Sequence, residues 1–406
     1  MNLKVKNYLI TYFTILFIFG VFFLYQKHDV GNDSTISEWL INYSGGFTKR
    51  GLIGQLCVYL SILFNLGLRD SIFILQTLIL FIYFFILFNF IKNIKFNKLL
   101  LLATLTPIFV LYPIAEIEVL ARKEIFIFCI FIFYLTDIVQ KYTAIYKLTF
   151  LPIAILIWEP VFFFIPFWFA VDIINKKIYN FNSVLIKNFS LYIPAILLSF
   201  YIALNPMSDE SHLEMVSFLK NYFNEGCYMS CGLLKTKSSI VQQFQGNFGR
   251  YSTEVFLRYF LIITIGFGPL LLIYKNSKLN NKNLIFFKFF RNLLLPFLII
   301  SSPVILLFAM GFDWGRWVNI SYTFSIIFYF YLNKKKLITT DKVLFMNIHK
   351  FFNYRYFYIL FFIFYCFGWN PKTVITGDVA SFPGYRIPYK TIKIINNKYI
   401  NKSNSY

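Results

Sequence analysis

The chain has 406 residues, of which 58% are hydrophobic and 22% aromatic, while only 14% are charged, and its mean hydropathy is +0.63. A water-soluble domain carries more charge and cannot bury so much apolar surface, so that class is excluded. The alternating pattern of an outer-membrane barrel is absent, which leaves an all-α polytopic integral membrane protein. Basic cytoplasmic loops explain the net charge of +21 without nucleic acid as a partner.

The N-terminal part predicts one crossing followed by a helix at the membrane surface. Lys4 and Lys6 precede an apolar run at about 8–25, so we expect a cytoplasmic N-terminus and a retained helix instead of a cleaved signal peptide. The polar stretch 26–50 then lies outside. The run 52–66 has about 15 residues where roughly 20 are needed to cross, so we interpret it as interfacial or re-entrant. If it crossed, every later segment would change sides.

Later apolar runs predict a series of spans. The expected spans are 71–91, 99–115, 125–139, 187–204, 255–274, 292–312, 317–332 and 356–369. The run 148–174 is interrupted at Pro160, which breaks a helix, so two half-length helices are expected to rise and fall back and to place Glu159 near the outer surface. The length criterion thus gives about eleven crossings plus the interfacial helix, in a single multispan domain of residues 1–406.

The charge bias assigns the connecting segments to two sides. Inner loops at 92–98, 175–187, 275–291 and 333–355 carry most of the lysines. Outer segments are expected at about 26–50, 116–124, 205–253 and 313–316, with a C-terminal tail at 370–406.

Segment 45–54, GGFTKRGLIG, places Lys49 and Arg50 within a run of glycines. One interpretation is an ordinary juxtamembrane turn whose cations extend towards lipid head groups. The other is a site where backbone amides approach a ligand closely and the arginine fork holds phosphate or carboxylate oxygens. The side of the membrane, and the other residues on that side, favour the second interpretation.

Four charged clusters meet on the outer face if the topology holds. They are Lys49 and Arg50; Glu116, Glu118, Arg122, Lys123 and Glu124; Glu159; and Asp313 with Arg316. The spacings of Glu118 to Arg122 and of Asp313 to Arg316 allow pairing on a helix. Taken singly, each cluster is also explained as an anchor of a short outer turn. Glu159 is the exception, because a carboxylate in a broken apolar helix costs free energy unless it has a partner or a task. Desolvation is expected to raise its pKa, which suits proton transfer.

The five cysteines fall into two groups. Cys57, Cys129 and Cys366 lie in apolar segments, where a cysteine usually acts as a small hydrophobe. Cys227 and Cys231 lie in the outer loop, where a short-loop disulfide is predicted and a redox-active pair is the alternative. The sequence predicts no metal site and no cofactor, since neither ligand spacings nor a phosphate-binding or dinucleotide fingerprint occurs.

The motifs SGGFTKRGLIG at 44–54, Arg122-Lys123-Glu124, Glu159-Pro160 and DWGR at 313–316 together resemble bacterial O-antigen polymerases of the Wzy type. More distantly, the chain resembles multispan glycosyltransferases of the GT-C fold. The resemblance implies transfer of a growing glycan from undecaprenyl pyrophosphate onto an incoming lipid-linked repeat unit at the periplasmic face of the inner membrane. Membrane lipids and a chain-length regulator are the further implied partners, and neither a nucleotide sugar nor a metal is implied.

The resemblance also implies roles for individual residues. Pyrophosphate would be held by Lys49, Arg50, Arg122, Lys123 and Arg316, with Glu118 and Glu124 in support. The base that takes a proton from the acceptor hydroxyl would be Glu159 or Asp313. The GT-C pattern expects an acidic residue in the first outer loop, and Asp29, Asp33 and Glu38 all fit that description.

Two other functions remain open at this point. A GT-C transferase could add a single sugar from a polyprenyl-phosphate donor, giving one added residue where a polymerase gives a ladder. A flippase for the lipid-linked repeat is the third hypothesis. Transporters usually place charges near the bilayer midplane and show symmetry between halves, whereas here the charges gather on one face.

Overall fold

The computed structural model describes residues 3–30, 32–232, 234, 240–280, 284–340, 355–377, 379 and 382–400. It is 76% helical, which confirms the all-α prediction. The first half contains α1 (Leu3–Val30), α2 (Ser34–Leu40), α3 (Gly51–Phe64), α4 (Leu68–Ile91), α5 (Lys98–Leu105), α6 (Tyr112–Ala115), η1 (Ile117–Val119), α7 (Glu124–Tyr134), α8 (Asp137–Lys141), α9 (Thr143–Ile157), η2 (Glu159–Phe164), α10 (Ile165–Asn175), α11 (Ser183–Ser190) and α12 (Ile193–Leu204).

The second half contains the remaining helices and two short strands. They are α13 (Asp209–Phe223), α14 (Tyr228–Gly232), α15 (Ile240–Phe248), α16 (Thr253–Lys275), β1 (Ser277–Leu279), η4 (Phe287–Phe289), α17 (Leu294–Ser301), η5 (Ser302–Val304), α18 (Ile305–Met310), α19 (Trp314–Lys334), β2 (Ile338–Thr340), α21 (Arg355–Phe367), α22 (Pro383–Ile395) and η6 (Asn396–Ile400).

Within the described residues, three helices are long and apolar enough to cross a membrane: Lys4–Asp29, Leu68–Ile91 and Thr253–Lys275. The pair α11 and α12, bent by 40°, makes a fourth if it counts as one span, and several shorter apolar helices accompany them. The chain is therefore built as an all-α membrane protein. The number of crossings, about eleven, stays a prediction because several expected spans are interrupted. For example, 99–115 is divided into α5 and α6, and 292–312 into α17, η5 and α18.

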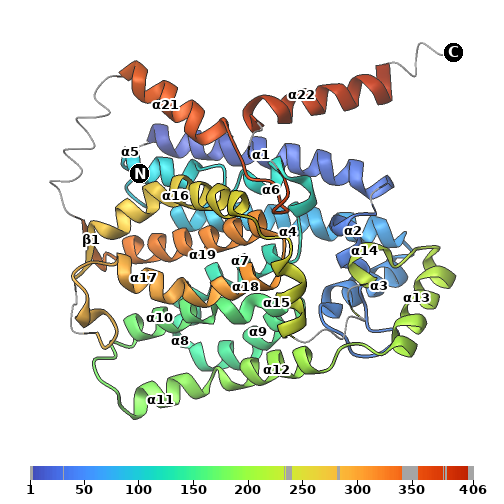
Figure 1. Ribbon diagram of the computed structural model, residues 1–406, viewed down its shortest axis with the longest axis horizontal. Coiled ribbons are helices and arrows are strands. Elements are labelled where there is room, and N and C mark those ends of the chain that lie inside the picture. Colours follow the sequence, from blue (N-terminus) through green and yellow to red (C-terminus); the bar gives the residue numbers. More distant parts are fainter. Residues whose placement is uncertain are drawn as a thin grey trace.

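The bundle has two distinct ends (Figure 1). The N-terminus and β1 lie at one end, while α2, α3, α13 and α14 lie at the other. At the first end β1 pairs antiparallel with β2, with Ser277 opposite Thr340 and Leu279 opposite Ile338. This pairing joins two loops that the charge bias assigns to the same side. We call the two ends the β1 end and the α2 end.

Helices α9 and α10 fold back on each other at the position of Pro160. Trp158 leaves α9 with an extended backbone, and Glu159 and Pro160 then start the 3₁₀ helix η2. Near the start of α9, Lys147 lies 2.5 Å from Asp172 near the end of α10, so the two helices run antiparallel. The predicted rise and fall of 148–174 is therefore correct in geometry, and Glu159 lies at the tip of the hairpin.

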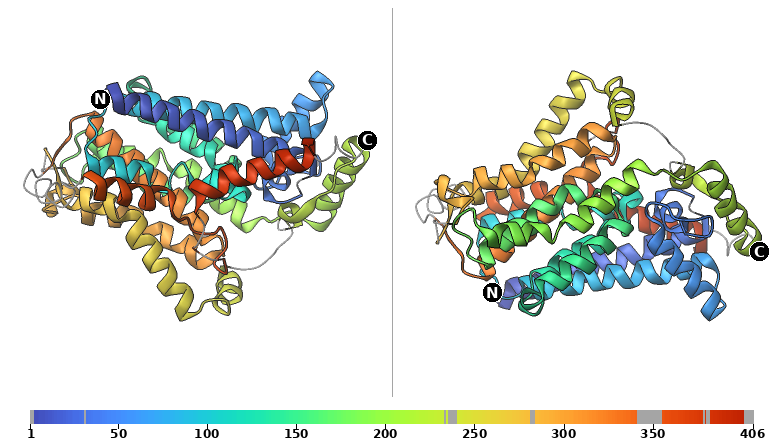
Figure 2. Two further views of the ribbon diagram at one scale, coloured as in Figure 1. Left: turned by 90° about the horizontal axis from the view of Figure 1, so that it is seen from above. Right: turned by 90° about the horizontal axis from the view of Figure 1, so that it is seen from below.

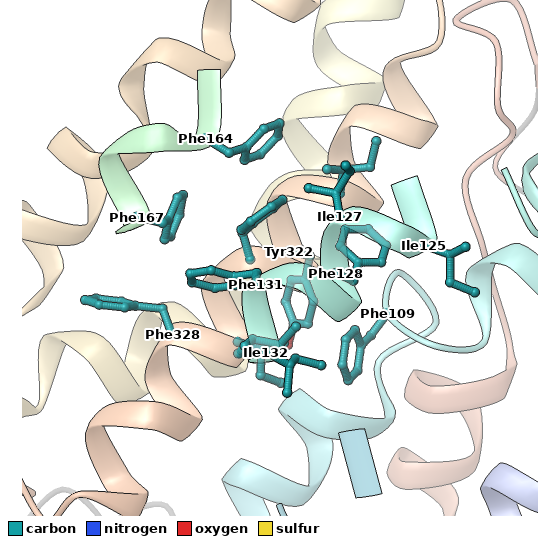
Figure 3. Packing of buried hydrophobic residues seen from close by; sticks show 14 of the residues in the cluster. Phe109, Ile125, Ile127, Phe128, Phe131, Ile132, Phe164, Phe167, Tyr322 and Phe328 are labelled. Carbon is teal, nitrogen blue, oxygen red and sulfur yellow. The ribbon is translucent and has the colours of Figure 1, made fainter. Parts of the chain in front are cut away.

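Aromatic packing around α7 and α19 forms the centre of the core. Phe131, Phe164 and Phe324 lie with ring centroids 4.5–5.0 Å apart in two of their pairs. Figure 3 shows side chains from four elements gathered in this region: Phe128 and Phe131 of α7, Phe164 of η2, Phe167 of α10 and Tyr322 of α19. This packed interior ends near Glu124, which begins α7, and Trp314, which begins α19, so it supports the charged residues at and next to those positions.

The segment 205–253, which the sequence predicts as a polar outer loop, contains helices in the structure. It contains α13, α14 and α15, and Figure 2 shows α15 projecting from the side of the bundle next to the start of α16. Ser208 caps α13 by accepting a hydrogen bond from the Ser211 amide, and Ser252 caps α16 in the same way through Val255. Local capping and amphipathic faces thus order a segment that lacks long apolar runs.

Candidate functional site

The short helix α2 carries Glu38 into the interior of the α2 end. Asp33 caps the helix by accepting a hydrogen bond of 3.0 Å from the Thr35 amide. Gln76 of α4 donates to the Thr35 carbonyl, and the Trp39 indole donates to the Ala121 carbonyl. All seven residues of α2 are buried, and Glu38 is only 1% exposed. A carboxylate held at such depth requires cations around it.

Three arginines from three different elements surround Glu38. Arg122 Nη2 lies 2.8 Å from Glu38 Oε1, Arg50 Nη1 lies at 3.5 Å and Arg316 Nη2 at 3.7 Å. Burial alone would raise the pKa of Glu38, but Arg122, Arg316, Arg50 and Lys123 together lower it to about 2. Glu38 is therefore ionised at all physiological pH values and acts as the shared anion of the three arginines.

Glu159 at the hairpin tip is bound by Arg50 through two parallel hydrogen bonds. Arg50 Nε donates to Oε2 at 2.8 Å and Nη2 donates to Oε1 at 2.7 Å. Burial favours the neutral acid, yet Arg50 and Lys49 lower the pKa of Glu159 below its usual value. The expectation of a raised pKa for Glu159 is therefore wrong, because the bidentate cationic partner outweighs the effect of burial.

Asp313 and Arg316 pair across one turn at the start of α19, as the spacing of three residues predicts. Arg316 Nη1 lies 3.2 Å from Asp313 Oδ2, and Arg122 Nη1 lies 3.4 Å from the same oxygen. Arg316 also forms an ion pair with Glu124. Asp313 is the most exposed of these carboxylates, at 31% of its side chain, and its nearest arginine nitrogen lies 3.2 Å away, farther than the nearest one of Glu38 or Glu159. It is thus the acid that is easiest to separate from its partners.

Two lysines complete the charges of the site. Lys123 is fully buried and donates to the Arg50 carbonyl. Burial lowers its pKa to about 8 although Glu38 opposes this shift. Burial likewise lowers the pKa of Lys49, against the attraction of Glu159. We call Glu38, Arg50, Arg122, Lys123, Glu124, Glu159, Asp313 and Arg316 the ion cluster; its cations and carboxylates are equal in number, and Lys49 lies beside it.

Polar atoms with unused bonding capacity remain in the ion cluster. Arg122 Nε and Glu124 Oε2 are buried and have no hydrogen-bond partner among the described residues. Both residues line a cavity of about 30 Å³ between α4, α7 and α19. One water needs at least about 10–15 Å³, so the cavity has room for water beside these two groups.

Glu116 and Glu118 lie outside the ion cluster. Glu118 is exposed, and its predicted pairing with Arg122 is wrong because the chain forms only the short 3₁₀ helix η1 before Ala121 adopts φ 49°. Glu116 instead pairs with Lys372 and Arg386 of the C-terminal segment. The segment after α21 therefore folds back onto the α2 end.

The glycines of segment 45–54 serve packing between helices. A Cβ on Gly45 would lie 1.9 Å from the Ser211 carbonyl of α13, and one on Gly54 would lie 1.8 Å from the Ile41 carbonyl that follows α2. Each position thus needs glycine so that two backbones can approach. Arg50, with φ 62°, then starts α3 and turns its side chain to Glu38 and Glu159. Arg50 of the motif belongs to the ion cluster and Lys49 lies beside it, while the glycines of the motif pack against neighbouring backbone.

The predicted disulfide between Cys227 and Cys231 is present. Cys57, Cys129 and Cys366 are free, and Cys57 and Cys366 are buried. In the described part of the chain, one group of three potential metal-ligating side chains lies within 4.8 Å, namely His212 with the two disulfide cysteines. The two sulfurs are joined to each other, so the cysteines form a covalent staple within segment 205–253.

Comparison of the chain with protein-family models, curated proteins and solved structures finds no match. The functional interpretation therefore depends on the geometry. That geometry brings together Arg50, Arg122, Arg316, Glu159 and Asp313, which the sequence predicts as one site. It also adds Glu38 as the centre. The sequence names Glu38, with Asp29 and Asp33, only as an acidic residue of the predicted first outer segment and does not assign it this role.

Proposed function

We propose that this protein is a membrane-embedded glycosyltransferase that polymerises oligosaccharide repeat units carried on undecaprenyl pyrophosphate, in the manner of an O-antigen polymerase. The observation that carries the proposal is the convergence of three arginines on one buried glutamate at the helix ends, with two carboxylates at the more exposed rim. Such a site suits an anionic substrate whose lipid stays in the membrane. The proposed setting is the periplasmic face of the bacterial inner membrane, with the N-terminus in the cytoplasm.

The balance of charge determines how an anion would bind. Each arginine already has a carboxylate partner, so phosphate oxygens must replace a carboxylate of the ion cluster. Asp313 is the candidate for replacement because its contacts are 3.2 and 3.4 Å and it is partly exposed. Arg122 and Arg316 would then turn to the pyrophosphate, while Lys49 adds a further cation. Glu38 keeps both arginines in place during the exchange.

This exchange supplies the base for the reaction. Asp313, released from its arginines, accepts the proton of the acceptor hydroxyl as that oxygen attacks the anomeric carbon of the donor sugar. The bond between the anomeric carbon and the pyrophosphate oxygen breaks, and the leaving group takes the electron pair. Arg122 and Arg316 stabilise the charge that develops there. Glu159, bound at two points by Arg50, has the role of a positioning residue.

A gel of surface polysaccharide from a strain in which the gene is deleted tests the proposal. We expect the ladder of long polysaccharide bands to collapse to the lipopolysaccharide core plus a single repeat unit. A plasmid with the wild-type gene should restore the ladder. A plasmid encoding Asp313→Asn should not restore it, whereas Asp137→Asn, a change in an exposed carboxylate at the β1 end, should. An intact ladder with altered mobility would identify a single-sugar transferase, and loss of every repeat would indicate a flippase or an earlier step.

A further inference from the structure

Helix α14 packs directly against α2, the helix that carries Glu38. The Ser37 hydroxyl donates a hydrogen bond of 2.7 Å to the Ser230 hydroxyl, and the Ser230 amide donates to the Ser37 hydroxyl at 3.3 Å. Both serines are buried, so α14 shields this face of α2 from water. Because Ser37 precedes Glu38 directly, any movement of α14 away from α2 would reach the centre of the ion cluster.

The Cys227–Cys231 disulfide joins the residue before α14 to the fourth residue of that helix. A helix of five residues is far too short to be stable alone, so this covalent link and its packing must hold it. Cys231 is fully buried in a small apolar cluster with Ile41, Met207, Met215 and Leu234. Ile41 directly follows α2. The disulfide therefore fixes the shape of α14, while Ser230 bonds to the middle of α2 and Cys231 packs in one cluster with the residue that follows α2.

We propose that the Cys227–Cys231 disulfide keeps the ion cluster closed by holding α14 against α2, and that reduction of this bond by a dithiol opens the cluster locally. The inference does not depend on the function proposed above. It makes the outer segment a redox-sensitive cover of the site. In the reduced protein, α14 loses its closure, water reaches Ser37 and Glu38, and the contacts between α2 and α3 loosen.

The chemistry of the opening is ordinary thiol–disulfide exchange. One thiolate of the dithiol attacks the Cys227 sulfur, which is partly exposed, and the Cys231 sulfur leaves as a thiolate and takes up a proton. The second thiol of the reagent then displaces Cys227, so the reagent ends as a disulfide and the protein gains two electrons and two protons. His212 Nε2, at 3.4 Å from the Cys227 sulfur, is placed to hydrogen-bond to the sulfur released there.

Two free thiols report on the opening. Cys57 is 0% exposed on α3, one turn after Gly54, whose Cα approaches the backbone that follows α2. Cys366 is equally buried but lies on α21, away from α2, α3 and α14. A local opening at α14 should expose Cys57 alone, whereas global unfolding should expose both.

The experiment treats the purified wild-type protein in detergent with a dithiol and follows maleimide labelling of each cysteine by peptide mass spectrometry. We expect the labelling rate of Cys57 to rise at least about tenfold on reduction while Cys366 stays protected, as in a local opening equilibrium. Protection of Cys57 after complete reduction would overturn the proposal. Simultaneous labelling of Cys57 and Cys366 would overturn it as well, because the disulfide would then stabilise the whole protein and not a local cover.

A pair of variants provides the matched control. Cys227→Ser/Cys231→Ser removes the disulfide without reagent and should give the fast labelling of Cys57 under oxidising conditions. Met229→Ala changes an exposed residue of the same helix, keeps the disulfide and should leave Cys57 protected. Equal protection of Cys57 in both variants would contradict the inference, and so would fast labelling in both.

Discussion

Two groups of buried charges lie at opposite ends of the hairpin of α9 and α10 and differ in how completely they are bonded. Near the base of the hairpin, Asp172 is 0% exposed and pairs with Lys147 at 2.5 Å. It also accepts hydrogen bonds from the hydroxyl groups of Tyr134 and Tyr192 and from the Asn188 amide. We call these five residues the Asp172 network.

The ion cluster at the tip of the hairpin differs in two respects. Its rim carboxylates, Glu159 and Asp313, are 22% and 31% exposed. Arg122 and Glu124 retain buried atoms without partners among the described residues, beside a cavity. A network whose acceptors are all occupied can only hold helices together, whereas a cluster with exposed and partly bonded groups can exchange partners with a ligand. The Asp172 network is thus a structural ion pair, whereas the ion cluster has the properties of a site.

The largest expected effect is on stability at the Asp172 network. Asp172→Ala should destabilise the protein by about 3–5 kcal/mol, because Lys147 is left as an uncompensated buried charge. The amount of folded protein and its melting temperature, measured by size-exclusion chromatography after heating, check this. The double variant Lys147→Met/Asp172→Leu should be more stable than Asp172→Ala. A double variant that is equally unstable would mean that packing, and not charge, dominates at this position.

The next effect is on activity and distinguishes the two rim carboxylates. Asp313→Asn should lower activity by about 100-fold to 10,000-fold, the usual range for loss of a general base, with normal protein levels. Glu159→Gln should lower activity less, since it weakens the position of Arg50 without removing the base. Ladder length and polymer yield in the complemented deletion strain provide the measurement.

The order of these two effects decides the assignment. If Glu159→Gln abolishes the ladder while Asp313→Asn keeps it, Glu159 is the base and the exchange of partners at Asp313 is wrong. Protein levels in the membrane must match in both strains, so an immunoblot accompanies each gel.

Much of the architecture follows from the sequence because apolar runs and proline have direct physical consequences. The helical class, the fold-back at Pro160, the pairing of Asp313 with Arg316 and the disulfide all rest on local patterns, and the structure contains each of them. The convergence of distant arginines also follows, because the charge bias assigns their segments to one side of the membrane.

Other features depend on tertiary contacts that local patterns do not contain. Glu38 becomes the centre only because α4, η1 and α14 hold α2 in place through side chains up to 193 residues away. Glu118 and Arg122 fail to pair because Ala121 interrupts the helix. The pKa of Glu159 moves down and not up because Arg50 lies beside it, a neighbour 109 residues earlier. Burial can be inferred from sequence, whereas partners require the fold.

A smaller effect is expected in how the stability of the protein depends on pH, and it tests whether Glu38 stabilises the fold through its charge. The pKa of Glu38 is lowered from 4.5 to about 2 in the folded protein. The stability that its ionised form contributes is therefore fully present above about pH 4.5 and is lost as the pH falls toward about 2. The wild type should therefore be more stable than Glu38→Gln by a constant amount above about pH 5, and the difference should shrink at lower pH. Thermal melts of both proteins in detergent measure it. A difference that stays constant down to about pH 3 would show that Glu38 does not gain its stability from ionisation.

The smallest expected effect tests how the arginine at the start of α3 holds Glu159. Arg50→Lys keeps the charge and removes the two-point contact, since an ammonium group cannot donate in parallel to both carboxylate oxygens. We expect a loss of about 1–2 kcal/mol in the free energy of unfolding. In a double-mutant cycle, Arg50→Lys should cost much less when Glu159 is already glutamine, because the pair is then absent. A cycle without coupling would mean that Arg50 stabilises the site mainly through Glu38. Packing, and not the ion pair with Arg50, would then hold Glu159 at the tip of the hairpin, in contrast to the ion pair at its base.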